Sequence, residues 1–247
     1  MIESKQNERV KKIRSLFNKK FRTEYSLFVA EGVKPVSEAL ISNAGVVTVF
    51  GTEKALLEVE SLGASFSGVE VLTVTDAVYK SVSDEVSPQG VLAVIKMPDL
   101  SPVKTEGKCL LLDGVSDPGN MGTIIRTAAA SGFNQIYCIN TVDPFAPKTV
   151  RSSMSGIFKV KIYSGERQEI LKSIDTPLIV ASMEGVNAFS FTSPEKFCLV
   201  IGNEANGVSD FVKNKADYTV SIPMQNGVES LNAGVSAGIL MYLLGVK

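Results

Sequence analysis

The sequence predicts an α/β protein with two domains: a small N-terminal α/β domain and a C-terminal α/β domain built on a parallel sheet. Short apolar runs of strand length alternate with helical patterns up to residue 95, and the alternation starts again at residue 108. The segment 97–107 between the two series has two prolines and little apolar content. We therefore expect domains at 1–96 and 108–247 joined by a linker, the second with the doubly wound sheet that alternating strands and helices produce.

The composition argues against several classes of function. Of the 247 residues, 45 % are hydrophobic and 21 % are charged, which is typical of a globular protein. No apolar run of about 18 residues and no apolar leader occurs, so we expect a cytoplasmic protein without membrane contact. The chain has no histidine and its three cysteines are far apart, which argues against a metal site, a disulfide framework and Ser-His or Cys-His catalysis.

Positive charge is concentrated at the N-terminus. Residues 1–22 carry eight basic and two acidic side chains, a net charge of +6, whereas the other 225 residues carry −7. Residues 5–19 place apolar side chains on one stripe and predict a helix (Val10, Ile13, Leu16 and Phe17). A basic helix of this kind is typical of a protein that binds RNA phosphates, and a solvated helix face is the alternative.

The alternating patterns define the expected elements. In the N-terminal domain we expect strands at 25–30, 46–50, 69–74 and 90–95 and helices at 33–41, 52–61 and 75–82. In the C-terminal domain we expect strands at 108–113, 136–139, 160–163, 178–181, 197–201 and 218–222 and helices at 119–131, 147–154, 166–173, 209–214 and 231–244. Ligands of such a sheet bind beyond the carboxyl ends of its strands, which points to the first, second and third loops at 113–120, 202–209 and 222–231.

The first loop leads into a helix. Asp117 followed by Pro118 is a typical helix start, because the carboxylate accepts a backbone N–H and the proline ring fixes φ. The helix has a stripe of apolar positions (Met121, Ile124, Ile125, Ala128 and Ala129). Arg126 lies off this stripe, close to a predicted ligand loop.

The first loop is not a nucleotide loop of a common kind. Gly114 and Gly119 have the spacing of a phosphate-binding P-loop, but Asn120-Met121 stands in place of its Lys-Ser/Thr pair. The dinucleotide pattern GxGxxG is absent as well. We therefore do not expect an ATP or NAD site.

The second and third loops each contain polar candidates. Gly202 and Gly207 allow a close backbone approach to a ligand, and Glu204 between them is either a carboxylate in a cleft or an exposed loop acid. Ser230 is either the N-cap of the last helix or part of an anion site at its first N–H groups. That helix is apolar on most sides, so we expect it in the core or against a partner subunit.

Together the three loops resemble the sequence motifs of the SpoU family of RNA 2′-O-ribose methyltransferases, in the SPOUT superfamily. The first motif is matched by Asp117-Pro118-x-Asn120-x-Gly122 and Arg126-Thr127-Ala128, the second by Gly202-x-Glu204-x-x-Gly207, and the third by Ile222-Pro223-Met224 and Ser230-Leu231-Asn232. Residues 1–96 resemble, less closely, the RNA-binding domain of that family, through Ser87-Pro88-Gln89-Gly90-Val91-Leu92-Ala93. The chain departs from the third motif at Asn232-Ala233-Gly234-Val235, where many members have Asn-Val-Ser-Val.

The resemblance implies S-adenosylmethionine-dependent methylation of a ribose 2′-hydroxyl in structured RNA, with ribosomal RNA favoured over transfer RNA. It also implies a deep trefoil knot in the C-terminal domain and a homodimer. Catalytic roles fall on Arg126, Asn120, Glu204, Ser230 and Asn232, and backbone groups at Gly202, Ile222, Met224 and Leu231 would hold the cofactor.

The family assigns the central role to Arg126, as base or as electrostatic stabiliser. A guanidinium group hardly ever loses its proton, which favours the second role. Asn120 would orient Arg126, and Glu204 would hold its loop. Ser230 and Asn232 would position the ribose or a phosphate.

Other functions remain open at this point. One is a non-catalytic RNA-binding protein with the same fold, and another is a transfer RNA 2′-O-methyltransferase. A third is a different α/β enzyme, such as a nucleotide-dependent transferase, although the residues of its phosphate loop are missing.

Overall fold

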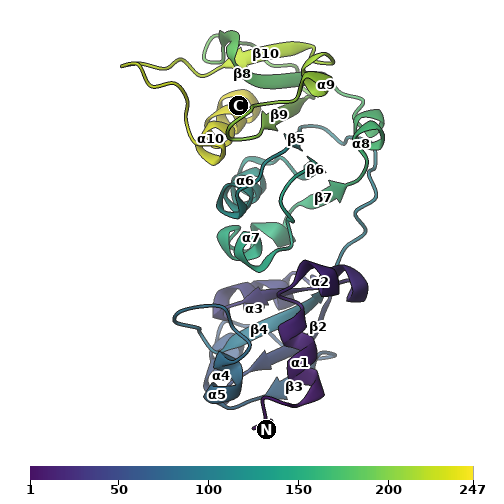
Figure 1. Cartoon of the computed structure of the whole chain (residues 1–247), viewed down its shortest axis with the longest axis vertical. Coiled ribbons are helices and arrows are strands. Elements are labelled where there is room, and N and C mark those ends of the chain that lie inside the picture. The colour runs from purple at the N-terminus through teal and green to yellow at the C-terminus, as the bar shows by residue number, and fades with distance from the viewer. Residues whose placement is uncertain (247) are drawn as a thin grey trace. The chain divides into compact units, whose positions relative to one another are not determined.

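The computed structural model describes residues 1–246 and forms two compact units (Figure 1). Unit 1 consists of Met1–Pro98 and Phe145–Phe158, and unit 2 consists of Asp99–Pro144 and the chain from Lys159 onward. The sequence alone places Phe145–Phe158 in the C-terminal domain, whereas the structure groups this segment with unit 1. In the described part of the chain, no helix is both long and apolar enough to cross a membrane.

Unit 1 combines a four-stranded sheet with helices. Its elements are α1 (Glu8–Ser15), α2 (Lys19–Tyr25), β1 (Leu27–Glu31), α3 (Val33–Ile41), β2 (Val46–Gly51), α4 (Glu53–Ser61), β3 (Glu70–Thr73), α5 (Asp76–Lys80), β4 (Val91–Lys96), α7 (Pro147–Ser152) and the 3-10 helix η1 (Gly156–Phe158). The sheet order is β1-β4-β2-β3. Strand β4 pairs antiparallel with β1 and β2, and β2 pairs parallel with β3. Most of the elements lie where the alternation predicts them, although η1 was not predicted.

The main exception is the N-terminal helix, which the sequence predicts over 5–19. In the structure α1 ends at Ser15, and a second helix that was not predicted, α2, runs from Lys19 to Tyr25. Asn18 between them has an extended backbone, and its side-chain oxygen accepts the Lys20 N–H at 2.9 Å. An asparagine that caps a helix in this way competes with continuation of the preceding helix. The Arg22 side chain is buried and donates to the Leu16 carbonyl at 2.9 Å, which fixes α2 against the end of α1.

The apolar stripe predicted for the first helix is confirmed. Val10, Ile13 and Leu16 are buried in the core of unit 1, and Phe17 packs at its margin. They share this core with side chains from the sheet and α5 (Val29, Phe50, Leu72, Val78, Tyr79, Leu92 and Val94). Burial of apolar side chains of this size stabilises a fold by about 1.5–3 kcal/mol each relative to exposure.

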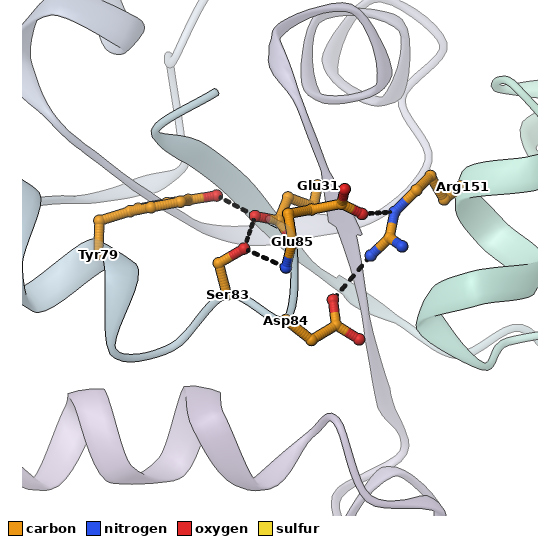
Figure 2. A network of polar contacts seen from close by, with 6 residues as sticks. All are labelled: Glu31, Tyr79, Ser83, Asp84, Glu85 and Arg151. Atoms are coloured by element: carbon orange, nitrogen blue, oxygen red, sulfur yellow. Dashed lines mark hydrogen bonds and ion pairs between the residues drawn. The ribbon is translucent and has the colours of Figure 1, made fainter. Parts of the chain in front are cut away.

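Helix α7 is tied to unit 1 by ion pairs of Arg151 (Figure 2). Its Nη2 lies 2.7 Å from Oδ1 of Asp84, and its Nε pairs with the carboxylate of Glu85. The Arg151 side chain is 37 % exposed, so water screens these pairs in part. These contacts hold α7 against the loop between α5 and β4.

The same cluster includes Glu31 at the end of β1. Glu31 accepts hydrogen bonds from the Tyr79 hydroxyl, at 3.0 Å, and from the Ser83 hydroxyl (Figure 2). Burial raises the pKa of Glu31, and the hydrogen bonds and the charge of Arg151 offset part of that increase. The cluster thus gathers three carboxylates around one guanidinium group.

Unit 2 is built on a six-stranded sheet. Its elements are β5 (Cys109–Asp113), α6 (Pro118–Ser131), β6 (Gln135–Ile139), β7 (Lys161–Ser164), α8 (Arg167–Ser173), β8 (Leu178–Asn187), β9 (Cys198–Gly202), α9 (Asp210–Lys213), β10 (Tyr218–Ser221) and α10 (Ala233–Gly245). The sheet order is β10-β8-β9-β5-β6-β7, and every neighbouring pair is parallel. The predicted parallel sheet is therefore confirmed. Strand β8 continues to Asn187, beyond its predicted end at 181.

The expected linker has no helix or strand, but part of it is hydrogen bonded to β6. Its residues from Asp99 onward belong to unit 2. The Tyr137 hydroxyl donates to the Val103 carbonyl at 2.8 Å, and Gln135 accepts the Glu106 N–H at 2.6 Å. This segment therefore lies along the amino-terminal end of β6.

Helix α10 packs against α6 (Figure 1). A Cβ atom on Gly234 would lie 3.2 Å from the Thr123 side chain, and one on Gly245 would lie 2.4 Å from the Phe133 ring. The glycines of α10 thus allow it to approach α6 and Phe133 of unit 2 closely. Elsewhere the helix and its C-cap Val246 leave large apolar side chains exposed (Val235, Tyr242, Leu243 and Val246).

Candidate functional site

The first and second loops follow neighbouring strands of the unit 2 sheet. Asp113, the last residue of β5, is the register partner of Gly202, the last residue of β9. Because the strands are parallel, the two loops begin side by side at the carboxyl edge of the sheet. Asn203 Nδ2 donates to the Gly114 carbonyl at 2.8 Å and joins the loops directly.

The second loop is a tight turn that closes on its own backbone. Asn203 and Gly207 exchange two backbone hydrogen bonds of 2.9 Å, and Gly207 has a φ of +67°. A Cβ atom on Gly202 would lie 2.2 Å from the backbone of Gly207 and Val208. The sequence suggests that Gly202 admits a ligand to the backbone, but the close neighbour in the structure is the chain itself.

Glu204 is held by four donors from the first loop. Its Oε1 accepts from Asn120 Nδ2 at 2.9 Å and from the Asp117 N–H at 3.2 Å. Its Oε2 accepts from the Ser116 hydroxyl at 2.8 Å and from the Ser116 N–H at 3.1 Å. Glu204 is therefore neither a free loop acid nor an unpaired cleft carboxylate, because it fixes the first loop to the second.

These hydrogen bonds control the ionisation of Glu204. Burial raises the pKa of its carboxyl group, but hydrogen bonds from Asn120, the Glu204 backbone and Ser116 outweigh burial and lower the pKa to about 2. Glu204 is consequently an anion at neutral pH and can only accept hydrogen bonds.

Asn120 extends this network to the third loop. Because Glu204 takes its amide nitrogen, the Asn120 oxygen faces the other way and accepts from Asn232 Nδ2 at 2.7 Å. The Asn232 oxygen in turn accepts the N–H groups of Gly234 at 2.9 Å and Val235 at 3.2 Å. Asn232 is therefore the N-cap of α10, and the interpretation of Ser230 as that cap is wrong.

Arg126 lies on the exposed side of α6. Within residues 1–246, no side chain or carbonyl hydrogen bonds to its guanidinium group or pairs with it. The expected contact from Asn120 to Arg126 is not present, because both ends of the Asn120 amide are engaged by Glu204 and Asn232. Arg126 thus retains its full set of donors for a ligand.

A cavity of about 380 Å³ opens beside the second and third loops. The four predicted cofactor residues all line it (Gly202, Ile222, Met224 and Leu231). Glu204 and Ser230 line it as well, whereas Asn120, Arg126 and Asn232 do not. Its volume lies in the range of about 300–1,000 Å³ that is typical of cofactor sites. The structure therefore gathers the predicted cofactor residues at one site.

Two further residues shape the site and are not among the sequence candidates. Asp113 is 4 % exposed, and its carboxylate accepts the Ser209 N–H at 2.8 Å, which fixes the far end of the second loop. Ser116 gives Glu204 both its hydroxyl and its N–H. The sequence signal for Asp113 is a carboxylate at the end of a buried strand, and for Ser116 it is only a polar side chain within the first loop. In the described chain, no group of three His, Cys, Asp or Glu side chains has the arrangement of a metal site.

The chain is similar to known RNA-modifying proteins over nearly its whole length. The model of the SpoU rRNA Methylase family matches residues 107–242, and that of the MRM3-like substrate binding domain matches residues 7–93. A Bacillus subtilis relative, 23S rRNA (guanosine(2553)-2′-O)-methyltransferase RlmP, is 31 % identical, with 98 % of each chain covered. The 23S rRNA (uridine(2479)-2′-O)-methyltransferase of Streptomyces viridochromogenes is 31 % identical over 92 % of this chain and 85 % of the relative.

Solved structures agree with this similarity. An rRNA methyltransferase from Sinorhizobium meliloti with bound AdoMet superimposes with a TM-score of 0.86, at 29 % identity, over 98 % of this chain and 95 % of that one. The SpoU methyltransferase AviRb from Streptomyces viridochromogenes, in complex with the cofactor AdoMet, gives a TM-score of 0.85 at 28 % identity, with 96 % and 97 % covered.

Proposed function

This chain belongs to the SpoU rRNA methylase family, and on that basis we propose that it methylates a ribose 2′-hydroxyl in large-subunit ribosomal RNA. The chain is an S-adenosylmethionine-dependent RNA 2′-O-methyltransferase. One observation carries the proposal for its site. The hydrogen bonds from Glu204 through Asn120 to Asn232 join all three loops beside one cavity.

The cavity fits the cofactor. Its mixed apolar and polar lining suits an adenosyl group with a charged amino-acid tail. We assign the walls of this site to Gly202, Ile222, Met224 and Leu231, which the loops place around the cavity. When bound there, S-adenosylmethionine supplies a methyl group on a positively charged sulfur.

Arg126 is the residue we assign to the reacting hydroxyl. The 2′-oxygen must share or lose its proton as it becomes a nucleophile, and negative charge then develops on it. A guanidinium group stays protonated, so Arg126 stabilises this charge and pairs with the neighbouring phosphate. The free donors of Arg126 support this assignment.

The other candidates hold the site in shape. Glu204 and Asn120 keep the first loop in place, and Asn232 fixes the start of α10. Ser230 lines the cavity, and in the described chain its hydroxyl has no protein partner, so we assign it to the ribose or a phosphate of the substrate. We therefore assign Glu204, Asn120 and Asn232 to positioning the loops and the start of α10. Ser230 and Arg126 are assigned to contacts with RNA.

We extend the proposal to the assembly and its place in the cell. The exposed apolar side chains of α10 support a homodimer, because a partner copy would remove them from water. We also propose the trefoil knot of the family around the second and third loops. The named relatives act on 23S rRNA, which supports a ribosomal substrate in the cytoplasm rather than transfer RNA.

The test is methyl transfer to RNA that lacks the modification. Total RNA from a strain without this gene is incubated with the protein and labelled S-adenosylmethionine, and 2′-O-methyl nucleotides are mapped by nuclease digestion and mass spectrometry. We expect one methylated site in large-subunit RNA. Label in transfer RNA would move the substrate to the alternative class. Cofactor binding without transfer to ribosomal RNA or its precursors would contradict the proposed substrate, and no cofactor binding would favour a non-catalytic RNA-binding protein.

A further inference from the structure

Two aromatic side chains lie together on the surface of unit 1. Phe21 and Tyr25 are one turn apart on α2, with ring centroids 6.0 Å apart and ring planes inclined by 24°. Tyr25 is 37 % exposed. Phe21 is half-buried, and neither ring belongs to the core cluster around Val10, Ile13 and Leu16. That cluster therefore does not account for the pair.

Two lysines flank this pair. Lys12 Nζ lies 5.0 Å from the centroid of the Tyr25 ring, and Lys20 Nζ lies 5.8 Å from that of Phe21. Both lysines are exposed, and no carboxylate in the described chain pairs with either of them. Lys12, Lys20, Phe21 and Tyr25 form what we call the aromatic–lysine cluster. It lies next to the +6 segment of residues 1–22 and shares two lysines with it.

The fold presents this cluster on a fixed support. The buried Arg22 donates to the Leu16 carbonyl and holds α2 against α1. Asn18 caps α2 at its start, and Ser26 ends it in the left-handed region with a φ of 51°. The side chains of the four cluster residues take no part in these contacts, since Lys20 contributes only its backbone N–H to the Asn18 cap. Their substitution therefore leaves the frame of α2 in place.

We propose that the aromatic–lysine cluster is a stacking site for an unpaired base of the RNA substrate. Exposed aromatic rings between cations are the usual means by which proteins hold unpaired RNA, because every base has a face that stacks and every nucleotide carries a phosphate. Tyr25 and Phe21 receive the base, and Lys12 and Lys20 contact the flanking phosphates. This inference rests on the proposed function, and it adds that the RNA has a loop or bulge where unit 1 binds.

The pairing state of the RNA distinguishes stacking from simple charge attraction. In a duplex the bases already stack on one another, so the rings gain nothing, whereas the lysines attract both forms. We therefore expect the aromatic side chains to affect only RNA with unpaired nucleotides. The lysines should set the salt dependence of binding to either form.

The experiment compares Tyr25→Ala, Phe21→Ala and Tyr25→Phe in the full-length protein by fluorescence anisotropy, with a 23S rRNA transcript and a fully paired RNA duplex. We expect Tyr25→Ala to raise the Kd for the transcript roughly 5- to 150-fold and to leave duplex binding within about twofold. Tyr25→Phe keeps the ring and should bind like the wild type. Phe189→Ala removes a 64 % exposed aromatic ring from unit 2 and serves as the matched control.

Equal losses on transcript and duplex, or no loss on the transcript, would overturn the stacking site. Photocrosslinking of 5-iodouridine-substituted transcript gives a second measurement, and we expect the crosslink at Tyr25 or Phe21. A crosslink only at residues outside the aromatic–lysine cluster would also overturn it. Methyl transfer is measured in parallel: transfer with unchanged binding by Tyr25→Ala refutes the stacking site alone, whereas a wild type that neither binds nor methylates RNA refutes the proposed function too.

Discussion

Asn120 Nδ2 donates to Glu204 Oε1 at 2.9 Å across 84 residues of sequence. The same amide accepts from Asn232 at 2.7 Å, so one side chain connects all three loops of the site. Because the Glu204 carboxylate can only accept, it determines which way the Asn120 amide faces, and this direction is what leaves the oxygen free for Asn232. The positions of the loops therefore depend on the charge of Glu204.

Glu204→Gln should weaken the site without unfolding the protein. The glutamine places an NH₂ group among four donors, so at least one hydrogen bond to a charged acceptor is lost, at a cost of about 1.5–3 kcal/mol. We expect kcat/KM to fall roughly 10- to 150-fold with little change in the circular dichroism spectrum. Glu195→Gln, at an exposed acid in the same unit, should behave like the wild type. Equal activity of the two variants would contradict the role of Glu204.

The low pKa of Glu204 predicts a pH dependence of stability. The folded pKa of about 2 is below the ordinary value of 4.5, so the ionised form is favoured by folding. The contribution is complete above the ordinary pKa and is lost as pH falls through the folded pKa. We expect the thermal midpoint of the wild type to fall between about pH 4.5 and 2 more steeply than that of Glu204→Gln. Parallel curves in calorimetry would contradict this.

Arg126→Ala should abolish methyl transfer and leave cofactor binding intact. Arg126 is exposed and lies outside the lining of the cavity, so its removal disturbs neither the fold nor the cofactor walls. We expect the rate to fall at least about 100-fold, as for loss of an oxyanion donor. Calorimetric titration with S-adenosylmethionine checks binding, and Arg167→Ala is the control. An active Arg126→Ala protein would rule out the assignment. Rescue by Arg126→Lys would show that a point charge suffices.

Gly202→Ala should displace the second loop. The added Cβ atom would lie 2.2 Å from the backbone of Gly207 and Val208, and backbone at this distance has to move. We expect a loss of about 1–3 kcal/mol in unfolding free energy, as for overpacked sites, and at least tenfold weaker cofactor binding. Gly165→Ala is the control, since its Cβ atom would meet its nearest neighbour at 3.5 Å. Normal cofactor binding by Gly202→Ala would show that the loop tolerates the displacement.

Arg151→Met should destabilise unit 1 in a pH-dependent way. It leaves Asp84, Glu85 and Glu31 without their shared cation, at a cost of about 1 kcal/mol for partly exposed pairs. Because the pKa of Glu31 is raised in the folded state, its contribution to stability is present at pH values below its ordinary pKa. This contribution is lost as the pH rises through the raised pKa. Loss of Arg151 raises that pKa further, so the thermal midpoint should fall more at pH 8 than at pH 5. Lys54→Met, which breaks an exposed pair with Glu58, should change little at either pH.

Local sequence signals predicted most helices and strands of this chain. They did not predict features that depend on contacts between residues far apart in the sequence. The helix start at Asp117 and the shared edge of the loops after Asp113 and Gly202 follow from capping and from parallel strands. The end of α1 at Ser15 was missed, because the apolar stripe continues to Leu16 and Phe17 and an asparagine such as Asn18 can cap a helix or lie within one.

Contacts between residues that are far apart in the sequence produce no periodic pattern in it. The Asn120–Asn232 hydrogen bond spans 112 residues, and the Arg151–Asp84 pair spans 67. The expected role of Asn120 beside Arg126 followed from the family resemblance and not from any local pattern. Only the fold shows that Glu204 and Asn232 engage both ends of its amide.

The membership of Phe145–Phe158 in unit 1 has a consequence for synthesis on the ribosome. Unit 1 is not complete when Pro98 has been made, because α7 follows only after the first part of unit 2. At about 5–20 residues per second, the chain between Pro98 and Phe158 takes roughly 3–12 s to make. During that interval Glu31, Asp84 and Glu85 lack Arg151. The nascent N-terminal unit is therefore less stable during this interval. Its last stabilising contacts form only when Phe145–Phe158, which lies in the sequence between two parts of unit 2, has been translated.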